Sequence, residues 1–245
     1  MLLDVIDVSK RFGGLQVIHD FSFQLTEGEA LGIVGPNGAG KTTLLSLVSG
    51  DHRSDSGRIL LDGTEIASMP AHQRCRRGIG RTAQIPRPFE GLTVFENVLV
   101  GSTFGSADRL RTSSPEAAAV AALEQSRLLD KANVVAGALT LLDRKRLELA
   151  RALATQPRLL LLDEIAGGLT EAEVLELVDT IKSIRSTGVT IVWIEHIMHA
   201  LLRVVDRMMA VDAGRKLIEG DPHEVMSSDA VRSVYLGDEL EGKAG

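Results

Sequence analysis

The first seventy residues carry short apolar runs with the spacing of β-strands. Residues 1–12 alternate apolar and polar positions, as a strand with one buried face does. Residues 29–35 contain a short apolar run that leads into a glycine-rich turn, which indicates a buried strand. Residues 41–50 have helical character, and Gly50 predicts where that helix stops. Residues 57–66 predict a strand pair or a hairpin arm, so we expect an N-terminal β region.

The strand signal fades between Pro86 and Pro157, where helical spacing takes over. Helical spacing marks residues 94–101, 114–129 and 143–154. Pro115 stands where a proline favours a helix start. Strand character then returns at residues 158–164 and 189–196, and helical spacing marks residues 171–188 between them. Strands that alternate with helices predict an α/β fold with a mainly parallel sheet, interrupted here by a helical subdomain.

Composition narrows the possible functions. The chain has 245 residues, of which 44% are hydrophobic and 24% charged, as in an ordinary globular protein. A net charge of −6 argues against nucleic acid as a partner, because binding phosphate backbones requires a basic face. A solvated loop is the commoner explanation for the basic strip from Arg74 to Arg81, and contact with an anion is the alternative. The lone Cys75 suits a reducing cytoplasm. No apolar run approaches the roughly 18–20 residues of a membrane span, so any membrane role must come through a partner.

Residues 35–42, GPNGAGKT, match the pattern G-x-x-x-x-G-K-[ST] between a predicted strand and a predicted helix. Glycines let the backbone turn its N–H groups toward phosphates, and the helix start adds its dipole. Lys41 supplies charge to the β- and γ-phosphates, and Thr42 offers a hydroxyl to Mg²⁺. The strand–loop–helix setting disfavours the alternative of a glycine turn with a stray lysine. We expect a nucleotide-binding loop made of Gly35, Pro36, Asn37, Gly38, Ala39, Gly40, Lys41, Thr42 and Thr43.

A second motif follows the helical region, where four leucines lead into Asp163 and Glu164. A buried parallel strand that ends in carboxylates presents them at the carboxyl edge of the sheet, where phosphates bind. We expect Asp163 to hold Mg²⁺ through water, and Glu164 to orient or deprotonate an attacking water. His196 ends a third apolar strand, where it would contact a γ-phosphate or the water, although a lone histidine is more often structural.

These motifs divide the chain into four predicted parts. The nucleotide-binding core begins with the β region and phosphate loop in residues 1–85 and resumes in residues 158–215. The helical subdomain occupies residues 86–157, and a C-terminal tail occupies residues 216–245. We expect the end of that tail, after Tyr235, to be frayed or loosely docked.

Nearly the whole chain resembles the ATP-binding subunit of an ABC transporter. The resemblance implies a P-loop NTPase core in which GPNGAGKTT is the Walker A loop, LLLLDE is Walker B and His196 is the switch histidine. It implies that Phe12 stacks on adenine, where the residue alone would suggest a core phenylalanine. It also implies that Gln84 is the Q-loop glutamine, which contacts Mg²⁺ and links the site to the membrane subunits. The implied cofactors are ATP and Mg²⁺.

Three segments of the sequence resemble one group of these ATP-binding subunits. Residues 78–101, the helix RLELARAL and the ending VRSVYLG are similar to ATPases of branched-chain, or hydrophobic, amino acid importers, a group that includes urea and amide importers. The lipopolysaccharide-export ATPase shares a similar ending and stays an alternative. A non-transport ABC-type ATPase would need long insertions or a second cassette, for which this chain has no room. An inactive regulator fits poorly with Lys41 and Glu164.

The resemblance also implies partners. The chain would form half of an ATPase dimer, homodimeric or heterodimeric, on the cytoplasmic face of the inner (plasma) membrane. It would be peripheral there, bound to integral membrane permease subunits and served indirectly by a periplasmic solute-binding protein. Each ATP would lie between one subunit's phosphate loop and the signature segment of the other. The transported molecule does not follow, because such subunits never touch it.

The signature segment departs from the family's LSGGQ, with Leu139, Thr140, Leu141, Leu142 and Asp143 in its place. Thr140 keeps a hydroxyl that would reach a γ-phosphate, but Cβ atoms replace both glycines. An altered contact and a degenerate signature both remain open, beside a plain helix start with Asp143 as its N-cap. The three cations at residues 144–146 crowd a first turn whose dipole disfavours each by about 0.3–1 kcal/mol, so we expect an anion nearby, Asp143 or the partner's nucleotide.

Two further departures lie after Glu164. Ile165 replaces the proline that usually follows the catalytic glutamate. Residues 166–170, AGGLT, lack the aspartate or asparagine that the D-loop offers after its leucine. Both changes touch what this chain presents to its partner's ATP. We therefore expect hydrolysis at the site that uses this chain's Walker A, and little turnover at the opposite site.

Overall fold

The computed structural model describes residues 1–105 and 114–233. It comprises two compact units, one of Met1–Pro70 with Val192–Gly245 and one of Ala71–Ile191. The strand β8 (Thr190–Ile194) crosses the boundary between them. The end of the chain after Tyr235, which we expect to be frayed, lies outside the described residues.

The first unit begins with an antiparallel sheet in the strand order β2-β1-β4-β5. These strands are β1 (Leu3–Phe12), β2 (Leu15–Leu25), β4 (Ser56–Leu61) and β5 (Thr64–Glu65). Leu3 lies opposite Leu25 on one side and Leu61 on the other, and all three are buried. Asp62 and Gly63 both have positive φ in the turn between β4 and β5, as a tight two-residue hairpin requires. The expected N-terminal β region is confirmed.

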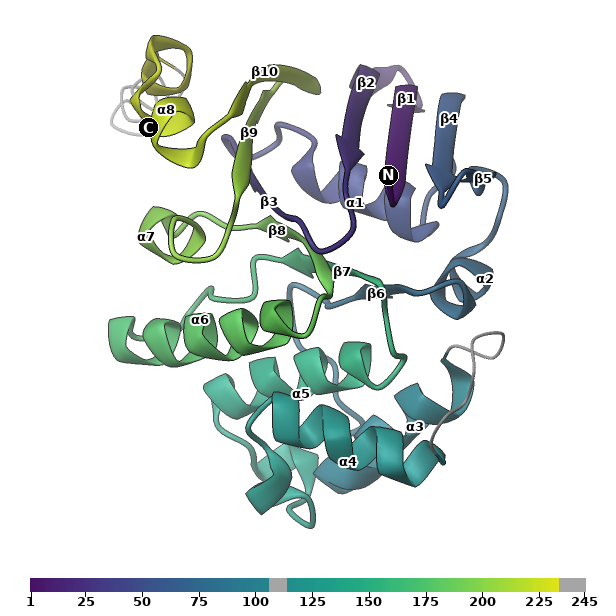
Figure 1. Ribbon diagram of the computed structural model, residues 1–245, viewed down its shortest axis with the longest axis vertical. Helices are drawn as coiled ribbons and strands as arrows, with labels where there is room; N and C mark the ends of the chain where they lie inside the picture. The colour runs from purple at the N-terminus through teal and green to yellow at the C-terminus, as the bar shows by residue number, and fades with distance from the viewer. Residues whose placement is uncertain (106–113, 234–245) are drawn as a thin grey trace. The chain divides into compact units, whose positions relative to one another are not determined.

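The first unit also contains the phosphate loop, which we define as residues 35–43 and which follows strand β3 (Ala30–Val34) in the chain (Figure 1). Strand β3 pairs in parallel with β9 (Arg207–Asp212), and β10 (Arg215–Gly220) pairs antiparallel with β9. Helix α1 (Lys41–Ser49) begins within the last three residues of the loop and stops at Gly50, as expected. Two short helices complete the unit, α7 (Met198–Leu201) and α8 (Pro222–Ser227).

The second unit combines a parallel strand pair with helices. Strand β6 (Ile79–Arg81) pairs with β7 (Leu159–Asp163), so the carboxyl ends of both lie at the same edge. Helices α3 (Val94–Phe104), α4 (Pro115–Gln125) and α5 (Leu141–Leu153) pack against one another, as Figure 1 shows. The other helical elements are α2 (Ala71–Arg76), η1 (Leu129–Lys131), η2 (Ala136–Ala138) and α6 (Glu171–Ser186). The expected α/β fold with a mainly parallel sheet and a helical region is confirmed.

The structure contradicts two local alternatives: Asp143 as the N-cap of α5, and a solvated loop at residues 74–81. Helix α5 begins at Leu141 and its N-cap is Thr140, whose hydroxyl accepts from the backbone N–H of Asp143, so Asp143 is not the cap. A threonine three residues before an acidic residue satisfies a helix start from outside the first turn. The basic strip is also not a solvated loop, because Arg74 lies fully buried on α2 and Arg81 ends β6.

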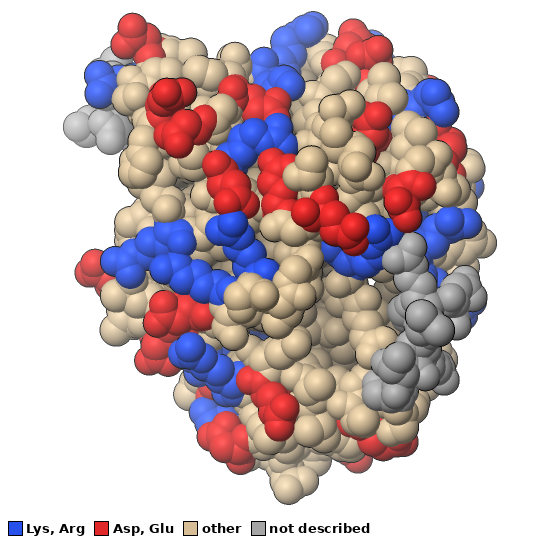
Figure 2. Space-filling model, viewed as in Figure 1, with Lys and Arg blue, Asp and Glu red and all other residues tan. Residues whose placement is uncertain are grey.

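Ion pairs connect charged side chains within each unit. On the face that Figure 2 shows, acidic and basic side chains are interspersed. Arg207 binds Glu29 and Glu219 in the first unit, and Arg146 binds Glu176 in the second. Among the described residues, no helix is long and apolar enough to cross a membrane.

Candidate functional site

Three glycines with positive φ shape the phosphate loop: Gly35 at 149°, Gly38 at 80° and Gly40 at 96°. A Cβ at Gly35 would lie 2.0 Å from the carbonyl oxygen of Val211. A Cβ at Gly40 would lie 2.8 Å from Ile18 Cδ1 and 2.9 Å from the carbonyl oxygen of Val17. The packing of the first unit therefore excludes side chains at these two positions. The main chain bends as it must to turn N–H groups toward an anion.

Lys41 is the first residue of α1 and is only 5% exposed. Its ammonium donates to the carbonyl oxygens of Gly35 (2.7 Å) and Pro36 (2.8 Å), so it lies across the loop. The N-cap Gly40 has no side chain to cap the helix, and the first turn carries no acidic residue. A positive helix end and a buried ammonium together favour an anionic ligand. Thr42, the second helical residue, is exposed.

Phe12 lies at the end of β1 and is 42% exposed, so it is not a core residue. Its ring meets the ring of His52 edge-on, with centroids 5.1 Å apart. The ammonium of Lys10 lies 5.3 Å from the centroid of the same ring. An accessible, supported aromatic ring offers a surface for a flat ligand group.

His196 lies just beyond β8 and its side chain is exposed. Its backbone N–H donates to the carboxylate of Glu195 at 3.0 Å. Glu195 itself is 2% exposed, so the chain leaves β8 with one buried acidic side chain and one exposed imidazole.

The second unit holds the acidic end of β7. Asp163 is 1% exposed, and its carboxylate accepts from the guanidinium of Arg81 at 3.0 Å. The backbone N–H of Asp163 donates to the hydroxyl of Thr82 at 3.4 Å. Because β6 and β7 run in parallel, Arg81 and Thr82 arrive at the edge where Asp163 stands. The buried carboxylate is therefore charge-compensated within its own unit.

Glu164 and Gln84 meet directly after this strand pair. The side-chain amide of Gln84 donates to the carboxylate of Glu164. Glu164 has φ of 47°, a left-handed conformation that non-glycine residues rarely adopt. Such conformations cost of order 1–3 kcal/mol and concentrate at functional sites. The strained turn aims the glutamate away from the buried strand, where its side chain is half-exposed.

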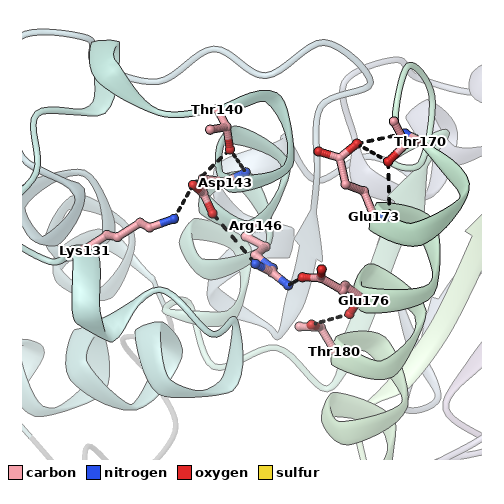
Figure 3. A network of polar contacts seen from close by, with 8 residues as sticks. All are labelled: Lys131, Thr140, Asp143, Arg146, Thr170, Glu173, Glu176 and Thr180. Carbon is pink, nitrogen blue, oxygen red and sulfur yellow. Dashed lines mark hydrogen bonds and ion pairs between the residues drawn. The ribbon is translucent and has the colours of Figure 1, made fainter.

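The signature segment starts α5 and is closed by contacts within the chain (Figure 3). The Thr140 hydroxyl donates to the Asp143 carboxylate at 2.9 Å while accepting from its backbone N–H. Asp143 is 4% exposed and also binds the ammonium of Lys131 at 2.5 Å and lies 3.8 Å from the guanidinium of Arg146. The carboxylate thus turns into the unit. Asp143 is thus one anion near the crowded cations of residues 144–146, because it lies beside Arg146; a contact with the partner's nucleotide stays a prediction.

The three cations of residues 144–146 each bind a different segment. Arg144 donates to the carbonyl oxygens of Leu139 (3.2 Å) and Gly137 (2.8 Å). Lys145 donates to the carbonyl oxygen of Gln84 at 2.9 Å. Arg146 binds Glu176 on α6 at 2.8 Å, as Figure 3 shows. The first turn of α5 is therefore a hub that ties the helix to three other parts of the second unit.

One of the residues after Glu164, Gly168, lies beside the start of α5. Gly168 has φ of 81°, and a Cβ there would lie 3.2 Å from Leu141 Cδ2. Leu141, which is 43% exposed, therefore packs over a glycine. Thr170 caps α6 and forms a capping box with Glu173, also drawn in Figure 3. Ile165 is 1% exposed and belongs to the core.

The sequence model of one protein family, described as ABC transporter, matches residues 18–167. The chain belongs to the ABC transporter family. Among curated proteins, it is 35% identical to the high-affinity branched-chain amino acid transport ATP-binding protein BraF of Pseudomonas aeruginosa, over 97% of this chain and 98% of that protein. It is 32% identical to the lipopolysaccharide export system ATP-binding protein LptB of Escherichia coli, over 96% of each chain.

Solved ABC structures share the fold. An ATP-binding cassette of an ABC transporter in its ADP conformation is 26% identical and has a TM-score of 0.87, covering 96% of this chain and 98% of that one. The chain is thus an ATP-binding subunit of an ABC transporter, an ATPase whose reaction is coupled to transport. Another solved structure, cbiO1 from Clostridium perfringens, is 26% identical with a TM-score of 0.82 and is part of an ABC transporter complex.

The predicted ABC site residues fall into two groups. The phosphate loop, Phe12 and His196 lie in the first unit, and Gln84, Asp163, Glu164 and the signature segment lie in the second. The structure brings Gln84 to Glu164, and Thr140 to Asp143. Their roles toward ATP remain predictions. A Cβ-free cradle beside a buried ammonium fits the phosphates of ATP.

The sequence motifs did not predict the contacts of four charged residues near these groups: Arg81, Lys131, Lys145 and Glu195. Arg81 lies in the basic strip that we expected to be solvated. Glu195 directly precedes His196 at the end of an apolar run, a position like that of Asp163, which offered a signal. Lys131 carries no local pattern that marks it.

Proposed function

We propose that the phosphate loop, residues 35–43, binds the phosphates of ATP and that Phe12 stacks on its adenine. The support is the glycine geometry of the loop, the buried Lys41 and the exposed ring of Phe12. Mg²⁺ would be held by the Thr42 hydroxyl, the Gln84 amide oxygen and, through water, Asp163. These are the oxygen donors that a hard cation prefers.

In this proposal Glu164 orients or deprotonates the water that attacks the γ-phosphate, with Gln84 and His196 as its neighbours in the reaction. The contact between Gln84 and Glu164 supports a shared task. The strained backbone of Glu164 supports a functional rather than a packing role.

The transporter would import branched-chain or other hydrophobic amino acids. One observation carries this choice: a high-affinity branched-chain amino acid transport ATP-binding protein is 35% identical to this chain over 97% of its length. The wording of residues 78–101 agrees with it. Urea or amides are alternatives within the same group. The second candidate is lipopolysaccharide export, favoured by the 32% identity to a protein of that function.

The chain would act as half of an ATPase dimer, peripheral on the cytoplasmic face of the inner membrane. Its partners would be a second ATPase subunit, integral permease subunits and, indirectly, a periplasmic solute-binding protein. The two ATP sites of the dimer would differ in their rate of ATP hydrolysis. The site built on this chain's Walker A would hydrolyse ATP, and the site completed by its altered signature segment would turn over slowly.

Uptake measurements test the transport class. The chain would be purified with the permease encoded beside it and reconstituted in vesicles with the neighbouring solute-binding protein. We expect ATP-dependent uptake of radiolabelled leucine, and its loss with Glu164→Gln while ATP binding persists. Uptake of urea but not of leucine would assign the transporter to the urea importers of the same group. Co-purification with a lipopolysaccharide-export permease would overturn it.

A matched pair of substitutions tests the asymmetry. Glu164→Gln in this chain should abolish nearly all ATPase activity of the reconstituted complex. The equivalent glutamate-to-glutamine change in the partner should remove only a small part. Equal losses from the two changes would refute the asymmetry without affecting the assignment of Glu164.

A further inference from the structure

Lys145 joins two segments that lie far apart in the sequence. It belongs to the first turn of α5 and is 5% exposed. Its ammonium donates to the main-chain carbonyl oxygen of Gln84 at 2.9 Å, across 61 positions of sequence. Burying an ammonium is costly unless it is hydrogen-bonded, so its geometry is well defined. The carbonyl of Gln84 is therefore tied to the helix.

The contact continues through the side chain of Gln84. Its amide donates to the carboxylate of Glu164, whose left-handed backbone fixes the direction of the turn. Two successive contacts thus join the start of α5 to Glu164. All three residues lie in the second unit.

The start of α5 is itself firmly held. Asp143, two residues before Lys145, is fixed by Thr140 and Lys131, and Arg146, the next residue, is fixed by Glu176 on α6 (Figure 3). A displacement of this helix start would move Lys145 with it, because the turn is rigid and multiply bonded. Gln84 would follow through its carbonyl.

We propose that Lys145 is a positioning residue for ATP hydrolysis. It fixes the main chain of Gln84 so that the Gln84 amide holds the Glu164 carboxylate, and it transmits movement of the α5 start to that carboxylate. The inference rests on the proposed role of Glu164 as the residue that orients the attacking water. It adds a link between the signature segment of this chain and its own catalytic glutamate.

Arg151 supplies a matched control. It also lies on α5 and also donates to a main-chain carbonyl of the same segment, that of Arg87, at 2.9 Å. Arg151→Met removes a cation-to-carbonyl bond, together with an ion pair to Glu148 and a contact with the Phe89 ring, but leaves Gln84 tied. Lys145→Met removes the bond to Gln84, and Lys145→Arg keeps a donor at that position.

The experiment measures ATPase kinetics of the assembled transporter for each variant. We expect Lys145→Met to lower kcat about tenfold with KM for ATP within twofold, which corresponds to about 1.4 kcal/mol. Lys145→Arg should restore most of the rate, and Arg151→Met should keep kcat within twofold. In a Gln84→Ala background, Lys145→Met should lower kcat less than twofold, since the amide through which it acts is gone.

Hydrogen exchange of the nucleotide-free protein gives a second measurement. Lys145→Met should speed exchange of the main-chain amides in residues 82–86, and Arg151→Met should not. An unchanged kcat in Lys145→Met, or a full tenfold loss that persists in the Gln84→Ala background, would overturn the proposal. Retained ATPase activity in Glu164→Gln would instead overturn the proposed role of Glu164.

Discussion

Helices α1 and α5 begin in opposite ways. Helix α1 is preceded by Gly40 in a left-handed conformation, has no side-chain cap and has no acidic residue in its first turn. Helix α5 is capped by Thr140, and the buried Asp143 in its first turn binds Lys131 and lies near Arg146. Every helix start must satisfy its unpaired N–H groups and its dipole. The first start suits an external anion, and the second is satisfied largely by its own side chains.

This difference bears on the two ATP sites of an ABC dimer. A loop of positive-φ glycines next to a buried lysine is built for close approach by phosphates. At the signature segment, Leu141 and Leu142 carry Cβ atoms, and the Thr140 hydroxyl is engaged with Asp143. The two helix starts thus agree with the proposed asymmetry between a site that hydrolyses ATP and one that turns over slowly.

The largest loss of stability and ATP affinity is expected when Gly40, the N-cap of α1, is replaced by threonine, the residue that caps α5. In Gly40→Thr, a β-branched residue must adopt φ of 96° with its Cβ about 2.9 Å from the carbonyl oxygen of Val17. Strain and overpacking of about 3 kcal/mol or more should follow, together with a loss of ATP affinity of at least 100-fold. Equilibrium dialysis with labelled ATP measures it. Gly38→Asn, at a position with open space, should lose much less; equal losses would contradict the packing argument.

Removing the buried carboxylate of α5 should have the next largest effect. Asp143→Ala leaves Lys131 and Arg146 without this partner and should lower the local opening free energy of α5 by about 2 kcal/mol. Hydrogen exchange of the α5 amides measures the change. Asp143→Asn keeps an acceptor for Thr140 and should lose about half as much. Unchanged protection in Asp143→Ala would show that the network does not hold the helix start.

Replacing Thr140, the N-cap of α5, with glycine, the residue that caps α1, should destabilise its helix less. In Thr140→Gly, the glycine keeps cap-compatible backbone, but the hydroxyl bonds to Asp143 disappear. We expect protection of the first α5 amides to fall by about 0.5–1 kcal/mol. Thr140→Ser, which retains the hydroxyl, is the control. A loss in Thr140→Ser as large as in Thr140→Gly would rule out the hydroxyl as the cause.

The smallest effect concerns α6, whose capping carboxylate is exposed. The backbone N–H and hydroxyl of Thr170 donate to Glu173 and hold its pKa below the ordinary value of 4.5. A lowered pKa means that the stabilisation is complete above 4.5 and is lost as the pH falls through the lower, folded-state pKa. Glu173→Gln should therefore slightly lower the melting temperature at pH 7. The difference from the native protein should shrink as the pH falls below 4.5, and a difference that stays constant over that range would exclude this cause.

The motifs that rest on local spacing were predictable from the sequence. The phosphate loop, the apolar strand before Asp163 and the stop of α1 at Gly50 each need only neighbouring residues to define them. The N-cap of α5 was left open, with Asp143 as one alternative, because threonine and aspartate both cap helices and both occur in LTLLD. The spacing of Thr140 and Asp143 matches a capping pair and was the signal to use.

The contacts that connect these motifs were not predictable in the same way. Arg81 reaches Asp163 because β6 lies beside β7, and Lys145 reaches Gln84 because α5 packs near the end of β6. Such pairs are separated by 61 to 82 positions and depend on tertiary packing. The crowding of residues 144–146 did predict a nearby anion, but it could not say which elements the three cations would tie together.

The discontinuous first unit also has a consequence for synthesis on the ribosome. Strand β3 pairs with β9, which lies at Arg207–Asp212, after the whole second unit has been translated. The second unit is one continuous stretch, Ala71–Ile191, and all of its strand pairs can close as it emerges. Strand β3, which leads into the phosphate loop, must wait for its pairing with β9 until residues 207–212 have been translated. We therefore expect the unit that contains the phosphate loop to be completed after the second unit.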